Sequence, residues 1–419
     1  MGKTIAEKII ARAAGAEEVQ PGDIVWVQID RAMMDDILGP RIQIAKQLEE
    51  LGVPVWDPEK VVIISDHYTP PATIQQAEIV KFTRDWARTH GIQNYYEFEG
   101  PCHQIMAETG NVRPGMIILG TDSHTCMGGA LNAFASGVGS TEMLGILATG
   151  KTWLKVPETI RVVWEGTLSE NVMAKDVSLK TIGQIGHSGA TYLSVEYQGN
   201  TIGEMSMDER MAISNMAVEM GAKAGIMPFD EKTKNFLDHI EVDAETYEPC
   251  FSDEDAVYQH TYNFRAEELK PQVACPHEVD HVTAAEELHN VPIHQAYLGS
   301  CTGGRLNDLK TAAEYLKGKK VAKGVRLLVS PASGKIWKEA DEKGYLGTIA
   351  EAGGVIMAPT CGVCVGLHSG LIAGGENCIS SSNRNFLGRM GSKEGQIYLA
   401  SPLTVAASAV AGRIQEGEK

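Results

Sequence analysis

Three cysteines of this 419-residue chain have a spacing that could hold a metal centre. Cys361 and Cys364 form a Cys-x-x-Cys pair, and Cys301 lies sixty residues upstream. The pair alone is also the pattern of a thioredoxin-like redox site, which would not need Cys301. Structural zinc and an iron–sulfur cluster held by four thiolates each require a fourth ligand that this spacing does not supply. Inert buried thiols are a further interpretation of the same residues.

Three thiolates without a fourth also suit a [4Fe–4S] cluster in which one iron is not ligated by cysteine. An open iron can act as a Lewis acid toward a substrate hydroxyl or carboxylate. Glycines near the cysteines would permit close backbone approach and direct N–H groups toward the sulfides. These glycines are Gly299, Gly303, Gly304, Gly362 and Gly366. Spacing alone leaves the cluster, zinc and inert thiols open.

The remaining cysteines show no metal-site spacing, and eight cysteines in a chain of this length do not make a disulfide framework. We expect these five to be ordinary core or loop residues. They are Cys102, Cys126, Cys250, Cys275 and Cys378.

The candidate chemical residues follow short apolar runs that we predict to be buried strands. The runs are 61–64, 116–119, 295–298, 325–329 and 355–357, and helical patterns cover 72–90, 308–317 and 334–343. Each run leads into a turn that carries Asp, His, Ser or Cys. Ligands of open α/β sheets bind beyond the carboxyl ends of the strands, where such turns converge. The pattern predicts an α/β fold with its chemistry in these turns.

The length predicts more than one domain, because single cores rarely grow this large. Between about 165 and 285 the chain becomes more acidic and less periodic, with an unpatterned stretch near 243–271. We predict three α/β domains, at 1–164, 165–284 and 285–419, with the cysteines in the third. No repeat of 20–50 residues is evident.

Composition and charge restrict the partners that we expect. The net charge of −17 repels phosphate backbones, and no dense Lys/Arg run offsets it, so no nucleic-acid partner is expected. No apolar stretch approaches the roughly 18–20 residues that span a bilayer. Residues 1–10 read as the start of an amphipathic helix interrupted by Glu7 and Lys8, not as a secretory signal. We therefore expect a cytoplasmic protein without a membrane partner.

Four motifs in sequence order closely resemble the aconitase superfamily over essentially the whole chain. They are Gly-Thr-Asp-Ser-His-Thr at 120–125, Gly-Ser-Cys-Thr-Gly-Gly-Arg at 299–305, Pro-Thr-Cys-Gly-Val-Cys-Val-Gly at 359–366, and Ser-Asn-Arg-Asn-Phe-Leu-Gly-Arg at 382–389. The length resembles that of the large-subunit families of 3-isopropylmalate dehydratase and homoaconitase. The resemblance implies three α/β domains around a central cluster cleft, without the swivelling fourth domain of the superfamily.

The resemblance also implies a role for each polar residue. Cys301, Cys361 and Cys364 match the cluster ligands. The matching acid–base groups are Asp66 with His67, Asp122 with His103, and His124 with Glu219. A histidine suits this work because its pKa lies near neutrality and a carboxylate can hold its tautomer. The matching substrate-binding residues are Ser123, Asn215, Asn383, Arg384 and Arg389.

The same residues also admit simpler interpretations. Taken singly, each histidine is more often a hydrogen-bonded structural residue than a catalyst, and the arginines would suit a solvated loop. Two arginines five residues apart do suit forked binding of carboxylates. Asp122, Ser123 and His124 are consecutive and cannot adopt the geometry of a serine-hydrolase triad. Asn215 precedes Glu219 by four residues, which predicts one shared helical face.

The chain departs from the superfamily pattern at three places. Asp35-Asp36 stands where Gln, His or Asn followed by Asp is usual, and an extra carboxylate there would repel an acidic substrate unless it is paired. Gly303 replaces the usual Asn, and Met127 occupies a position that is Asn in aconitase itself. These departures put the substrate in doubt, not the cluster or the acid–base groups.

The implied reaction is reversible loss and addition of water on a malate-type hydroxy acid, a small di- or tricarboxylate. In the superfamily the base that removes the proton lies in the swivelling domain, which nothing here resembles. We therefore expect a separate small subunit that carries this domain, and no activity from the large chain alone. An RNA-binding regulator of the aconitase type is a remote alternative that the negative charge disfavours.

Overall fold

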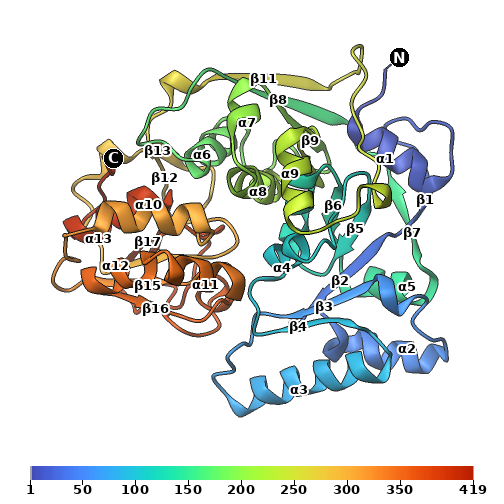
Figure 1. Ribbon diagram of the computed structural model, residues 1–419, viewed down its shortest axis with the longest axis horizontal. Coiled ribbons are helices and arrows are strands. Elements are labelled where there is room, and N and C mark those ends of the chain that lie inside the picture. Colours follow the sequence, from blue (N-terminus) through green and yellow to red (C-terminus); the bar gives the residue numbers. More distant parts are fainter. Residues whose placement is uncertain (1, 419) are drawn as a thin grey trace. The chain divides into compact units, whose positions relative to one another are not determined.

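The structure is a computed structural model that describes residues 2–418, and these form two compact units (Figure 1). The first unit comprises Met1–Glu97, Ile105–Glu165 and Ala190–Phe264. The second comprises Phe98–Gln104, Gly166–Gly189 and Arg265–Lys419. Each unit contains a sheet with at least five parallel strands, together with helices, which confirms the predicted α/β class.

The first unit contains a five-stranded sheet in the order β4-β3-β2-β5-β6, with every neighbouring pair parallel. Its strands are β2 Arg31–Asp35, β3 Val61–Ser65, β4 Asn94–Glu97, β5 Ile117–Gly120 and β6 Phe134–Gly137. The chain runs outward from β2 to β4 and then returns to place β5 on the other side of β2. The strand order therefore reverses between β2 and β5, and the loops after these two strands leave in opposite directions.

Helices and a small ribbon accompany this sheet. The helices are α1 Ile5–Ala14, α2 Ala45–Leu51, α3 Ile74–Thr89, α5 Ser140–Thr149 and α4 Cys102–Glu108, whose start up to Gln104 belongs to the second unit. The ribbon pairs β1 Ile24–Gln28 antiparallel with β7 Lys151–Lys155. The predicted amphipathic helix at the N-terminus is α1, which begins at a capping box formed by Thr4 and Glu7. This box satisfies backbone N–H groups that the first helical turn leaves open.

A second sheet of the same unit has the order β10-β9-β8-β11. Its strands are β8 Thr159–Glu165, β9 Ser194–Gln198, β10 Ala224–Ile226 and β11 His260–Arg265, and the helices nearby in sequence are α7 Asn200–Glu204, α8 Met207–Asn215 and α9 Glu231–His239. β11 lies inside the stretch 243–271 that sequence patterning left unassigned. Its pattern of exposed and half-buried residues explains why no apolar periodicity marked it.

The second unit contains a seven-stranded sheet in the order β13-β12-β18-β17-β14-β15-β16. Its strands are β12 Gln272–Ala274, β13 Val282–Ala284, β14 Gln295–Leu298, β15 Arg326–Val329, β16 Gly354–Ile356, β17 Asn377–Ser380 and β18 Gln396–Ala400. β12 is antiparallel to both neighbours, and the five strands from β18 to β16 are parallel. The order of the parallel strands reverses between β14 and β17.

The helices of the second unit are α6 Ala174–Ile185, α10 Leu306–Leu316, α11 Gly334–Glu342, α12 Tyr345–Ala352 and α13 Pro402–Ala411. Figure 1 shows α10 to α13 with the strands in the orange-to-red part of the chain. Buried aliphatic residues such as Leu298, Leu309 and Val405 fill the core beneath them.

Every strand predicted from an apolar run is present within one or two residues of its expected bounds. The helical patterns 72–90, 308–317 and 334–343 correspond to α3, α10 and α11. The three-domain division at 164/165 and 284/285 stays a prediction. Among residues 2–418, none of the helices combines the length and apolar character that a membrane crossing requires.

Asp176 on α6 predicts a pH dependence of stability. Its carboxylate accepts N–H groups of Met173 and Gln272, both at 2.8 Å, but burial raises the pKa of Asp176 from 3.8 to about 7. Between these values the folded chain holds the proton more tightly than the unfolded chain. The contribution of Asp176 to the free energy of unfolding is therefore greatest below pH 3.8, the ordinary pKa. It falls by up to about 1.4 kcal/mol per pH unit as the pH rises toward about 7, the pKa in the folded chain.

Asp176→Asn cannot ionise, so we expect its free energy of unfolding, relative to wild type, to improve from about pH 5 to about pH 7.5. Urea unfolding at both pH values measures the difference. Asp341→Asn, an exposed carboxyl on α11 of the same unit, is the control. An Asp176→Asn difference that does not change with pH would contradict the prediction.

Candidate functional site

The loops at the β2/β5 reversal of the first unit are joined by buried polar side chains. Asp35 ends β2, and its Oδ2 accepts the hydroxyl of Thr121, just after β5, at 2.7 Å. Its Oδ1 accepts the N–H groups of Ile37 and Leu38 at 2.6 and 2.7 Å. Burial raises the pKa of the Asp35 carboxyl, although the charge of nearby His67 opposes this shift. Asp35 thus ties the two strand ends together.

Asp36 holds the loop after the adjacent strand β3. Its two carboxylate oxygens accept the backbone N–H groups of His67 and Tyr68 at 3.0 and 2.9 Å. Oδ1 also lies 3.3 Å from Nδ1 of the His67 ring. Both Asp35 and Asp36 are buried and paired in this way. The departure at these positions therefore creates no unpaired carboxylate.

The predicted pair of Asp66 and His67 is present at the end of β3. The distance between Asp66 Oδ1 and His67 Nδ1 is 2.7 Å, and both side chains are buried. His67 thus has two carboxylates beside one ring nitrogen. Carboxylates beside one ring nitrogen orient an imidazole and hold its tautomer, an arrangement that suits proton transfer from the other ring nitrogen.

A second histidine follows β5 on the 3-10 helix Ser123–Leu131. His124 Nε2 lies 2.8 Å from Glu219 Oε1, so the structure brings the two residues of this pair together. The other ring nitrogen lies 3.4 Å from Oδ1 of Asp122, whose Oδ2 is 3.8 Å from His67 Nε2. Asp122 is partly exposed, and its two carboxylate oxygens lie near one ring nitrogen of each imidazole.

Asn215 and Glu219 do not share one α-helical face as expected. The helix α8 ends at Asn215, and Glu219 lies on the 3-10 helix Met216–Met220 that follows it. The tighter turn, with three residues per turn in place of 3.6, changes the direction of the side chain. Both residues are buried.

In the second unit the loops at the β14/β17 reversal carry Cys301 and three of the predicted substrate-binding residues, Asn383, Arg384 and Arg389. Ser381, just after β17, accepts the N–H of Gly299 at 2.9 Å. Asn383 accepts the Ser300 hydroxyl at 3.0 Å and donates through Nδ2 to Cys301 Sγ at 3.4 Å. These bonds fix the thiol of Cys301 against the loop that leads to Arg384.

Packing explains the departure at Gly303. A Cβ at this position would lie 2.2 Å from Ser381 Oγ and 2.3 Å from Ser381 Cβ. The hydroxymethyl group of Ser381 fills the space that a side chain at 303 would need. Asn does not fit here unless Ser381 moves, so the side chain that position 303 can hold depends on the side chain at position 381.

The other two candidate ligands lie on the loop after β16, around the 3-10 helix Gly362–Val365. Burial, together with the nearby sulfurs of Cys364 and Cys361, raises the pKa of Tyr297 well above its ordinary value. Tyr297 lies on β14, four residues before Cys301. Arg389 Nε donates to the Cys364 carbonyl at 2.9 Å, which connects the arginine loop to this turn.

The remaining predicted residues lie as follows. Arg384 is half-buried, with its guanidinium 5.7 Å from the centre of the Phe386 ring. Ser123 is half-buried at the start of its 3-10 helix. His103 is buried at the start of α4, in the part of that helix that belongs to the second unit, and its Nε2 lies 3.6 Å from Cys102 Sγ. Its pairing with Asp122, a residue of the first unit, stays a prediction.

The three candidate ligands fit an iron–sulfur cluster. All three lie in one unit and form no disulfide; Cys301 and Cys364 are buried and Cys361 is half-buried. An amide N–H directed at a ligating sulfur, as Asn383 provides for Cys301, is a typical outer-shell bond of such sites. The other five cysteines are scattered, as expected, and burial raises the pKa of Cys378 to about 12, which keeps it an inert thiol.

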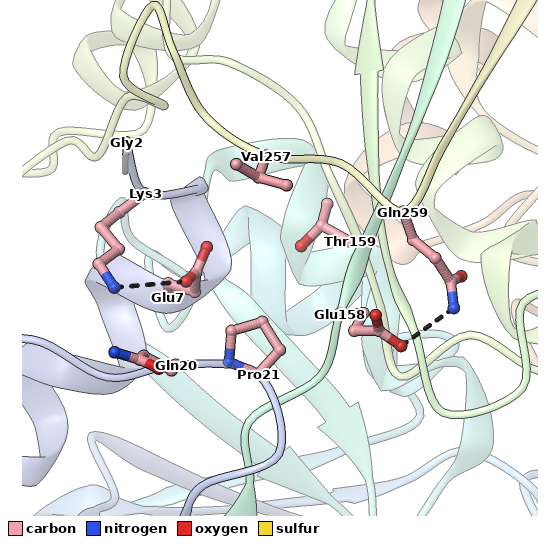
Figure 2. A pocket seen from close by; sticks show the side chains of 9 residues that line it. All are labelled: Gly2, Lys3, Glu7, Gln20, Pro21, Glu158, Thr159, Val257 and Gln259. Atoms are coloured by element: carbon pink, nitrogen blue, oxygen red, sulfur yellow. Dashed lines mark hydrogen bonds and ion pairs between the residues drawn. The ribbon is translucent and has the colours of Figure 1, made fainter.

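Two hollows of the first unit differ in their relation to these residues. One of about 420 Å³ is lined by Thr121 and Ser123, which follow β5, and by Ser136 and Gly137 of β6. Another of about 220 Å³ lies beside the start of α1 and contains none of the predicted site residues (Figure 2). Its polar groups contact one another, as Lys3 does Glu7 and Gln259 does Glu158. The first hollow is the one that adjoins the polar cluster.

Comparison with known proteins agrees with this geometry. The model of the Aconitase family (aconitate hydratase) matches residues 7–290 and 281–412. The chain is 49% identical to 3-isopropylmalate dehydratase large subunit 1 of Methanopyrus kandleri, covering 99% of each chain. It is 46% identical to the probable methanogen homoaconitase large subunit of Methanothermobacter thermautotrophicus, covering 98% of this chain and 96% of that protein.

A solved structure, the holo-form of Thermococcus kodakaraensis aconitase X, shares the fold with a TM-score of 0.51. It is 13% identical and covers 86% of this chain and 84% of its own.

Sequence reasoning missed the residues that support the site. In the sequence Asp36 stands only as a departure, Thr121 is part of a motif without an assigned role, and Ser381 lies just outside the motif 382–389. Asp36 and Ser381 contact residues 31 and 82 positions away in sequence. No local spacing could have revealed these contacts, which depend on which strands are neighbours.

Asp36 predicts a measurable loss of activity. In Asp36→Asn one of the two backbone N–H groups of His67 and Tyr68 faces an amide NH₂, and the imidazole loses a charged neighbour. We expect kcat to fall by about tenfold or more while KM changes less. Steady-state kinetics of the complete enzyme measure both. The control is Glu78→Gln, which likewise replaces a carboxylate by an amide, at an exposed position on α3. A kcat of Asp36→Asn within about twofold of wild type would contradict the role of Asp36.

Gly303 and Ser381 predict a coupled effect on stability. Gly303→Ala should destabilise the second unit by about 1–3 kcal/mol because its methyl meets Ser381. In a Ser381→Gly background the same change should cost less, by about 1 kcal/mol in a double-mutant cycle. Denaturant unfolding measures all four variants. Gly347→Ala on α12, where a Cβ meets nothing within 4 Å, is the control, and strict additivity would contradict the prediction.

Proposed function

Because this chain belongs to the aconitase family, we propose that it is the cluster-bearing large subunit of a hydro-lyase that acts on a malate-type hydroxy acid. The observation that carries the proposal is the buried array in which Asp66 and Asp36 hold His67 while Asp122 and Glu219 hold His124. Such an array suits proton transfer to and from oxygen.

Cys301, Cys361 and Cys364 would hold a [4Fe–4S] cluster whose iron without a cysteine ligand supplies Lewis-acid chemistry toward a hydroxyl. The Asn383 amide would orient Cys301, and the Tyr297 hydroxyl, kept protonated by its surroundings, would add no competing charge. The fit rests on three cysteines that form no disulfide, on glycine turns and on an amide donor, all in one unit.

Separate residues of the chain would transfer protons and bind the substrate. His67 would give its proton to the departing hydroxyl, and its two carboxylates would stabilise the cation beforehand. His124 with Glu219 and Asp122 would exchange a proton with water, and His103 would assist Asp122. Arg384, Arg389 and Asn383 would bind substrate carboxylates, because a guanidinium offers paired donors to a carboxylate. Ser123 and Asn215 would complete the substrate site.

The substrate that we favour is 3-isopropylmalate, with the chain acting in leucine biosynthesis. The similar proteins from Methanopyrus kandleri and other organisms named as large subunits of that dehydratase support this choice. Homoaconitase is the main alternative, supported by one similar large subunit. A citramalate isomerase or a 2,3-dimethylmalate dehydratase would use the same chemistry. The name "large subunit" of these similar proteins supports a small-subunit partner, which would carry the swivelling domain and the base. We expect the complex to act in the cytoplasm.

The proposal is tested by activity with and without the partner. The chain should be purified anaerobically, its cluster reconstituted, and the small subunit added. We expect dehydration of 3-isopropylmalate, followed as absorbance of the alkene product, from the complex alone. Homocitrate, citramalate and 2,3-dimethylmalate should be assayed beside it. Turnover by the large chain unaided would contradict the need for a partner, and inactivity on all four acids would contradict the function.

A further inference from the structure

Lys175 is a buried lysine close behind the loop that carries Cys301. It lies on α6 and is 1% exposed. Burying an ammonium group costs several kcal/mol unless hydrogen bonds and nearby negative charge offset the loss of water. Its Nζ donates to Thr302 Oγ1 at 3.1 Å and to the carbonyl of Ser382 at 2.7 Å.

The hydrogen bonds beyond Lys175 lead to the sulfur of Cys301. The Thr302 hydroxyl, which accepts from Lys175, donates to Asn383 Oδ1 at 2.6 Å. Asn383 in turn donates through Nδ2 to Cys301 Sγ at 3.4 Å. Every donor in this series is oriented toward the sulfur. Hydrogen bonds aligned in one direction polarise one another, so the ammonium strengthens the donor that the sulfur receives.

We propose that Lys175 is a positioning residue that places a positive charge, through Thr302 and Asn383, behind the ligand Cys301 and so stabilises the more negative state of the centre that Cys301 binds. This inference rests on the proposed function, because it assumes an iron–sulfur cluster at the three cysteines. Lys175 also bonds to Ser382, the residue before Asn383. The same side chain therefore joins the cysteine loop to the arginine loop.

The charge has a consequence for redox behaviour. Three thiolates around a cluster leave net negative charge, and one-electron reduction increases it. Net charge and hydrogen bonds to the sulfurs are the main controls of cluster potential. Without the ammonium, the reduced state should lose more stabilisation than the oxidised state. The midpoint potential should then become more negative.

The test compares Lys175→Met with wild type and with Lys180→Met. Lys180 lies on the same helix but is exposed, so its loss removes a charge without touching the network. Each chain is reconstituted anaerobically, its iron and sulfide content is measured, and its cluster is titrated by electron paramagnetic resonance. At the wild-type midpoint we expect the reduced-to-oxidised ratio of Lys175→Met to fall about tenfold, which is about 59 mV for one electron. Lys180→Met should match wild type.

Thr302→Val keeps the charge of Lys175 but removes the hydroxyl that links Lys175 to Asn383. This variant replaces Lys175→Met in the test if Lys175→Met does not fold. We expect it to shift the potential in the same direction by less, and Thr302→Ser to match wild type. A folded Lys175→Met, or failing that a folded Thr302→Val, with the wild-type potential would overturn the inference. Absence of a cluster from wild type would instead overturn the proposed function, so the two failures are distinguishable.

Discussion

The structure depends on the reversal of strand order within two parallel sheets. At such a reversal the loops from two adjacent strands part, and the space between them opens at the carboxyl ends. The first unit has this arrangement between β2 and β5, where Asp35, Thr121 and Asp122 lie. The second has it between β14 and β17, where Cys301, Ser381 and Asn383 lie. Each reversal gathers polar side chains that are distant in sequence.

Polar groups gathered in this way are buried, and burial is tolerated only where each group has partners. The site meets this requirement largely through its own loops. Asp36 accepts backbone N–H groups that the turn after β3 would otherwise leave open, and Ser381 does the same for Gly299. The groups that orient the candidate catalytic residues are therefore also the groups that satisfy the backbone. The same hydrogen bonds orient the candidate catalytic residues and stabilise their loops, so variants at these positions should change both activity and stability.

Sequence patterning predicted the parts of the molecule that depend on neighbours along the chain. The runs that became β3, β5 and β14 are short, apolar and followed by polar turns, so their ends were evident. The pair of Asp66 and His67 is adjacent in sequence and was recognised from its motif. The support given by Asp36, Thr121, Ser381 and Lys175 could not be predicted, because it depends on which strands lie side by side. The change from α8 to a 3-10 helix after Asn215 was missed because both helices suit the same residues.

The contact between Gly303 and Ser381 has a consequence for the history of such chains. Two positions 78 residues apart share one volume, so a change at either alters which residues the other accepts. A lineage that moves from Gly to Asn at 303 would have to reduce the side chain at 381 first, since the reverse order passes through an overpacked intermediate. Substitutions between the form with Gly303 and the form with Asn at 303 are therefore expected to occur in one order, first at 381 and then at 303. Ancestral chains between the two forms should show the smaller residue at 381 before the larger one at 303.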